Sequence, residues 1–155
     1  MFEKILVPLD GSSLSEKALP HAVELARKFG SELILLRVVI LPVRPEDVGM
    51  ETMVPLDFPA LEDKKTEQIQ ASLRRVKERL KADGVPVRLE VERGAPAAAI
   101  QKFVKREQVG LVVMSSHGRT GFSGWVYGSV AGKLLKALTC PVLLVRIPPK
   151  ELSSD

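Results

Sequence analysis

The chain has 155 residues, of which 45% are hydrophobic and 27% are charged, and its 23 Lys and Arg against 19 Asp and Glu give a net charge of +4. This composition is typical of a globular domain and too weakly basic for a dedicated nucleic-acid binder, and the lone Cys140 excludes an internal disulfide and a multi-thiolate zinc site. The first apolar stretch, residues 5–9, ends at Asp10 and is too short for a signal peptide or a membrane span. We therefore expect one domain over residues 1–155, in the cytoplasm, with no nucleic-acid or membrane partner.

Short apolar runs rich in branched residues alternate with longer amphipathic stretches along the chain. Nearly continuous apolar runs of this length predict strands that are covered on both faces of a sheet. The strands predicted in this way are residues 4–9, 32–40, 109–114 and 141–147, and residues 85–92 are predicted as a further strand because their side chains alternate between apolar and polar. Helices are predicted over 13–29 and 61–83, from Pro96, and after Gly128.

The first predicted helix has a candidate capping box and an internal proline, and two later segments are predicted to lack regular structure. Ser13 and Glu16 have the spacing of a capping box, and Pro20 inside the predicted helix should kink it. Residues 41–60 contain several prolines and no periodicity, which predicts a long flap loop, and residues 150–155 are expected to form a frayed tail.

The alternation of strand and helix predicts a single doubly wound, Rossmann-like α/β domain, with a parallel sheet and helices on both faces. In such sheets, ligands bind beyond the carboxyl ends of the strands, where the strand order reverses. This directs attention to the segments that follow the predicted strands: residues 10–12, 38–40, 94–95 and 115–129.

The loop over residues 115–129 carries most of the glycine among these segments. Gly128 and Ser129 stand where a helix begins, and the free amides and positive dipole end of a helix favour phosphate, to which Arg119 would add a cation. The alternative is a plain glycine-rich turn with Ser129 as the helix N-cap. The glycine spacing matches neither a P-loop nor a dinucleotide fingerprint.

Other polar residues have two interpretations each. Asp10 could form an Asx turn into the following residues, or it could contact a ribose or hold a magnesium ion. His117 could shape its loop through hydrogen bonds or contact a ligand. Cys140 is interpreted as a small buried hydrophobe. No set of nucleophile, base and acid can be assembled, so no catalytic residue is predicted.

At these residues the chain resembles the universal stress protein family. The resemblance runs from residues 5–12 at the amino end to residues 140–145 at the carboxyl end and so covers essentially the whole chain. The ATP-binding branch of that family carries the motif G-x2-G-x9-G-[S/T]. Gly118, Gly128 and Ser129 match its last three elements in register, and Ser115 stands in place of the first glycine.

The resemblance implies ATP and Mg²⁺ as cofactors and a strand order of 3-2-1-4-5. It also implies a homodimer formed through the last strand, by Val142, Leu143, Leu144 and Val145, which would cover an apolar edge strand. In the implied site, the adenine and ribose lie among Pro8, Leu9, Asp10, Val38, Met114 and Ser115, with Asp10 also on the metal. The phosphates would be surrounded by Gly118, Arg119, Gly128, Ser129 and Val130.

The hypothesis that follows is an ATP-binding regulatory switch of the stress response that acts on an unknown protein partner. Hydrolysis or autophosphorylation would be slow, because no general base is evident near the phosphates. The alternative is a dimeric interaction or adaptor protein of the same fold that binds no nucleotide. An adenylyl-transferring enzyme is a third hypothesis, and the absence of an S-G-G-x-D-S-type loop after the first strand argues against it.

Overall fold

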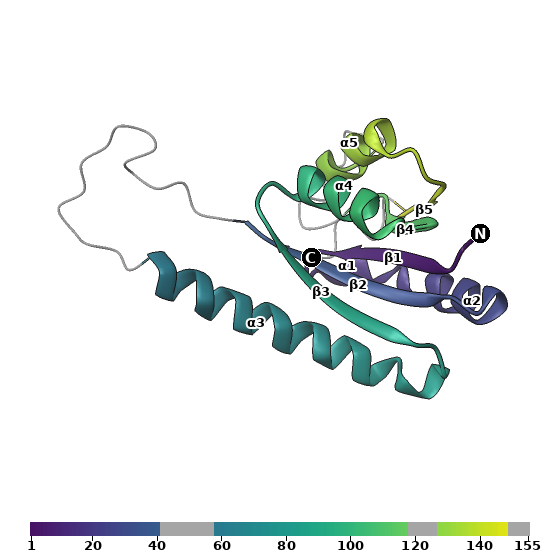
Figure 1. Cartoon of the computed structure of the whole chain (residues 1–155), viewed down its shortest axis with the longest axis horizontal. Coiled ribbons are helices and arrows are strands. Elements are labelled where there is room, and N and C mark those ends of the chain that lie inside the picture. Colours follow the sequence, from purple (N-terminus) through teal and green to yellow (C-terminus); the bar gives the residue numbers. More distant parts are fainter. Residues whose placement is uncertain (41–57, 118–126, 149–155) are drawn as a thin grey trace.

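The computed structural model describes residues 1–40, 58–117 and 127–148 (Figure 1). Five parallel strands form one sheet in the order β3-β2-β1-β4-β5. This confirms the predicted doubly wound α/β fold and the strand order that the family resemblance implied. The strands are β1 (Lys4–Leu9), β2 (Glu32–Val39), β3 (Val87–Arg93), β4 (Leu111–Ser115) and β5 (Val142–Val145).

Helices of the described residues cover both faces of this sheet (Figure 1). Among the described residues, no helix is both long and apolar enough to cross a membrane. The helices of the first face are α1 (Ser13–Glu16), α2 (Leu19–Phe29) and α3 (Phe58–Arg79). Those of the second face are α4 (Pro96–Glu107) and α5 (Ser129–Ala137).

The core is divided by the sheet into two apolar layers. Ile5 and Val7 of β1 pack toward α2 and α3, whereas Leu6 between them packs toward α4 and α5. Alternate side chains of a strand point to opposite faces, so a strand covered on both sides must be apolar at nearly every position. Phe103 of α4 is fully buried in the second layer.

The predicted helix over residues 13–29 is two helices, α1 and α2. Pro20 lies in the first turn of α2, where its missing N–H needs no partner, so it marks a helix start rather than a kink. The predicted capping box is also wrong: the N-cap of α1 is Ser12, whose Oγ accepts a hydrogen bond from Ser15 N at 3.1 Å. Glu16 instead pairs with Arg79 of α3 at 2.6 Å.

The second predicted helix starts earlier and ends earlier than the sequence pattern indicates. α3 begins at Phe58, so residues 58–60 are helical and the predicted loop over 41–60 is too long at its carboxyl end. The α-helix ends at Arg79, and a 3₁₀ turn follows before Gly84 adopts a left-handed conformation with φ of 69°. Residues 41–57 of the predicted flap and the predicted tail at 150–155 lie outside the described residues.

Cys140 is partly buried and packs against the apolar layer of α4 and α5. Burial raises the pKa of its thiol, which therefore remains protonated near neutral pH. This agrees with its interpretation as a small hydrophobic residue.

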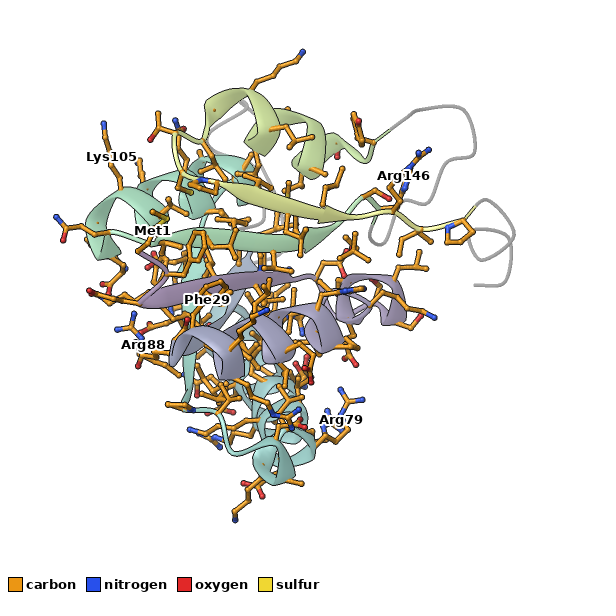
Figure 2. The ribbon with its side chains drawn as sticks, turned by 90° about the vertical axis from the view of Figure 1, so that its right-hand side faces the viewer. Met1, Phe29, Arg79, Arg88, Lys105 and Arg146 are labelled. Atoms are coloured by element: carbon orange, nitrogen blue, oxygen red, sulfur yellow. The ribbon has the colours of Figure 1, made fainter. Side chains whose placement is uncertain are left out.

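Ion pairs gather at the amino ends of the strands, far from the edge where a ligand is expected. Glu107, at the end of α4, accepts hydrogen bonds from Arg88 of β3 at 2.9 Å and from Lys4 of β1 at 3.5 Å. Figure 2 shows Arg88 on the same side of the molecule as Met1, with Arg146 on the other side. The hydrogen bond from Arg88 lowers the pKa of the Glu107 carboxyl, and Lys4 lowers it further.

We expect Glu107 to stabilise the fold at neutral pH and to lose that effect in acid. Its pKa is lower in the folded chain than the value of about 4.3 of an unfolded glutamate. The stabilisation is therefore fully present above about pH 4.3 and disappears as the pH falls through the lowered pKa. Urea unfolding of wild type and Glu107→Gln should show a less stable variant at pH 7 and a smaller difference at pH 3. A difference that does not change with pH would contradict this assignment.

Candidate functional site

The carboxyl ends of β1 and β4 lie side by side in the middle of the sheet. β1 pairs with β2 on one side and with β4 on the other, so the chain connections run in opposite directions from this point. The crevice expected at a reversal of strand order therefore lies beyond Leu9 and Ser115, the last residues of β1 and β4. Two of the four segments singled out from the sequence, the turn after β1 and the loop after β4, begin here.

The turn after β1 is closed by the carboxylate of Asp10. Its Oδ1 accepts hydrogen bonds from the backbone N–H of Ser12 at 2.9 Å and from the Ser12 hydroxyl at 2.6 Å. The Asp10 N–H in turn donates to Ser15 Oγ at 3.3 Å. This is the Asx-turn arrangement, one of the two roles considered for Asp10, and it holds the carboxylate at the end of β1.

Arg37 supports this turn from the face of α3, and sequence reasoning missed it. From β2, its guanidinium donates to the Asp10 carbonyl at 3.1 Å and to Ser72 Oγ of α3 at 2.8 Å. Gly11 lies directly against it, since a Cβ at Gly11 would stand 2.9–3.0 Å from the guanidinium atoms. The only signal in the sequence was a single charge within the otherwise apolar run of residues 33–40.

The end of β4 carries two of the predicted site residues. Met114 is buried in the layer of α4 and α5. Ser115, which replaces the first motif glycine, donates its hydroxyl to the His117 carbonyl at 2.6 Å. The extra side chain at this position is therefore accommodated by a local turn.

His117 is buried and takes part in shaping the same turn. Its Nδ1 lies 3.1 Å from Ser116 Oγ, and only 6% of the residue is exposed. Of the two roles considered for His117, hydrogen bonding within the loop is the one that this geometry displays.

α5 begins beside the end of β4, with Gly128 at its N-cap. The Gly128 N–H donates to the Ser116 carbonyl at 2.7 Å, and a Cβ at Gly128 would lie 3.3 Å from the same oxygen. The N-cap glycine has no side chain to cap this helix, and the first turn of α5 contains no acidic residue. Ser129 is the first helical residue rather than the N-cap, which corrects the alternative prediction. This uncapped amino end has the amide donors and positive dipole that suit an anion.

The remaining predicted residues differ in where their side chains lie at this edge of the sheet. Leu9 packs into the layer of α2 and α3, so its side chain points away from α5. Val38 and Val130 are partly buried on the face of α4 and α5, and Pro8 is half-buried. Gly118 and Arg119 lie outside the described residues. Within the described ranges, no group of three or more His, Cys, Asp or Glu side chains could hold a metal ion.

Comparison with known proteins identifies the family. The model of the universal stress protein family matches residues 1–146. This chain belongs to the universal stress protein family. A curated relative, universal stress protein MJ0531 of Methanocaldococcus jannaschii, is 33% identical over 153 residues, which are 97% of this chain and 86% of the relative.

Solved structures of the family have the same fold. The structure of MJ0577, another universal stress protein of Methanocaldococcus jannaschii, has a TM-score of 0.78 at 30% identity and covers 96% of this chain and 98% of its own. A universal stress protein family member of Arabidopsis thaliana, solved with AMP bound, has a TM-score of 0.66 at 20% identity. Here 98% of this chain and 96% of the Arabidopsis chain are covered.

The close approach of Arg37 to Gly11 in this universal stress protein predicts a strong effect of Gly11→Ala. Gly11 has φ of +87°, where an L-residue is strained, and its new Cβ would also collide with a guanidinium held by hydrogen bonds. We expect Gly11→Ala to lower the free energy of unfolding by at least about 2 kcal/mol.

Gly84→Ala is the matched control, because Gly84 also has a positive φ, of +69°, but no atom lies within 4 Å of the position that its Cβ would take. It should cost about 1 kcal/mol, from the backbone alone. Equal losses for both variants in chemical denaturation would show that Arg37 does not hold the turn.

Proposed function

We propose that this protein binds an adenine nucleotide, ATP with Mg²⁺, between the Asp10 turn and the amino end of α5, and acts as a regulatory switch in the stress response. The observation that carries the proposal is the uncapped amino end of α5, which Gly128 fixes against Ser116 at the end of β4. The neighbouring strand, β1, ends in the Asp10 turn.

The two sides of the crevice would divide the nucleotide between them. Pro8 and the backbone of Val38 would line the adenine, while Asp10, Met114 and Ser115 would lie near the ribose. Leu9 would contact the nucleotide only through its backbone, because its side chain packs into the apolar layer of α2 and α3. The phosphates would meet the amides of Gly128, Ser129 and Val130, together with Gly118 and the cation of Arg119.

Magnesium would be held chiefly by the phosphates and by water. Mg²⁺ in nucleotide sites commonly takes one or two protein carboxylates beside the phosphate oxygens. Asp10 would supply that carboxylate, although its Oδ1 already accepts two hydrogen bonds from Ser12. A switch of this kind needs only slow hydrolysis or autophosphorylation, since its output is the difference between the bound and the free protein.

Membership of the universal stress protein family supports this proposal, and so does the AMP bound to the Arabidopsis member of the family. We place the protein in the cytoplasm as a single domain over residues 1–155.

We propose further that two copies associate through β5. In the described part of the chain, β5 pairs with β4 along one side and lies at the end of the sheet. Leu143 is 38% exposed there. An apolar edge strand with free backbone groups is a surface that a second copy would cover.

Calorimetric titration with Mg·ATP tests the nucleotide proposal. We expect about one site per chain with a dissociation constant on the order of 1 μM, or about −8 kcal/mol. Gly128→Ala should weaken binding about tenfold or more, because its Cβ would push the amino end of α5 away from the Ser116 carbonyl.

Gly132→Ala is the control for this titration. Gly132 lies one turn further along α5 with no atom within 4 Å of its Cβ position, so the substitution should leave the affinity unchanged. The absence of heat up to millimolar ATP in wild type would favour the nucleotide-free adaptor instead.

Sedimentation analysis of Leu143→Lys tests the dimer. The charge would be buried in the proposed interface, so the variant should be monomeric at concentrations where wild type is dimeric. Leu135→Lys on α5 introduces the same charge at a site of nearly equal exposure, 37%, and should remain dimeric. A dimeric Leu143→Lys variant would place the interface elsewhere.

A further inference from the structure

Ser116 joins the amino end of α5 to the carboxyl end of β5. Its carbonyl accepts the Gly128 N–H at 2.7 Å, and its own N–H donates to the Val145 carbonyl at 2.8 Å. Its Oγ accepts the Ile147 N–H at 3.0 Å and lies 3.1 Å from Nδ1 of His117. One residue thus connects the proposed phosphate end of the site with the last described segment of the chain.

Burial makes these hydrogen bonds hard to replace by water. Ser116 is 3% exposed, and Ile147 and His117 are each 6% exposed. A buried N–H that loses its acceptor keeps the cost of desolvation without compensation, so Ile147 is held in place through Ser116. Figure 2 shows Arg146, the residue between Val145 and Ile147, at the end of β5.

We propose that Ser116 is a positioning residue that couples occupancy at the amino end of α5 to the segment Val145–Ile147. A ligand bound to the first turn of α5 would restrain Gly128, and through the Ser116 carbonyl and hydroxyl it would restrain the amide of Ile147. The ligand part of this inference rests on the proposed nucleotide function, whereas the mechanical link from Gly128 to Ile147 does not.

The segment Val145–Ile147, which ligand binding at α5 would restrain, lies beside the proposed dimer surface. Val145 is the last residue of β5, and exposed Arg146 follows it. A change in the order of this segment would therefore be presented at the edge of the sheet that a second copy or a protein partner would meet. The coupling is reciprocal, so a partner bound at this edge would change the nucleotide affinity by the same factor.

Amide hydrogen exchange of the full chain, resolved at Gly128 and Ile147, tests the coupling. Saturating Mg·ATP should slow exchange of the Ile147 amide about tenfold in wild type, within the usual range of coupling between sites. The effect of Mg·ATP at Ile147 should be lost in Ser116→Ala. Ser31→Ala is the matched control: Ser31 is also fully buried and its hydroxyl donates to the Phe2 carbonyl, at the far end of the sheet. The response at Ile147 should persist in that variant.

A comparison without nucleotide separates this inference from the proposed function. Gly128→Ala should speed exchange of the Ile147 amide in the free protein, and Gly132→Ala should not. If Mg·ATP changes no amide of α5 but Gly128→Ala changes Ile147, the nucleotide proposal fails and the link stands. If Gly128→Ala leaves Ile147 unchanged, or Ser116→Ala retains the full response to Mg·ATP, the coupling is overturned.

Discussion

β1 pairs with β4 in the middle of the sheet, and this pairing joins the amino-terminal part of the chain to its carboxyl-terminal part. Ile5 lies beside Leu111 and Leu6 beside Val112, although more than 100 residues separate these partners in the chain. Parallel pairing sets the carboxyl ends of the two strands next to each other. The Asp10 turn and the start of α5 are therefore brought to the same edge of the sheet. Without this pairing they could not contribute to one site.

Each half of this edge is supported by a buried or partly buried polar residue that joins it to a neighbouring element. Arg37 reaches from β2 to the carbonyl of Asp10 on the face of α3. Ser116 fixes Gly128 at the start of α5 and Ile147 after β5. These hydrogen bonds therefore hold in place the backbone groups that would contact a ligand. Positions fixed in advance in this way reduce the ordering cost of binding.

Four of the strands could be predicted from the sequence because each is a short apolar run, and β3 because its apolar and charged residues alternate. Their parallel arrangement followed from the helices between them. The order of the strands came from the family resemblance, since apolar runs such as those containing Leu6 and Ile34 do not specify their neighbours. Local sequence patterns led to wrong predictions at two places in the first helical segment. Pro20 indicates a kink or a helix start equally well, and the choice of Ser12 over Ser13 as the cap depends on the Asp10 turn.

The sequence indicated where a site could lie but not the contacts that shape it. Glycine and small polar residues after β1 and β4 pointed to the carboxyl edge of the sheet, which stays a prediction. The roles of Arg37 and Ser116 depend on contacts with Ser72 and Ile147, which are distant in sequence and come close only in the folded chain. Leu9 illustrates the same limit, because the face toward which its side chain points is set by the register of β1 in the sheet.

We propose that the turn after β1 and the start of α5 form one nucleotide site, and amide chemical shifts recorded during a titration with a non-hydrolysable ATP analogue test this proposal. Residues 10–12 and residues 128–131 should shift together, with a single dissociation constant. Shifts confined to one of these segments, or different constants for the two, would contradict it.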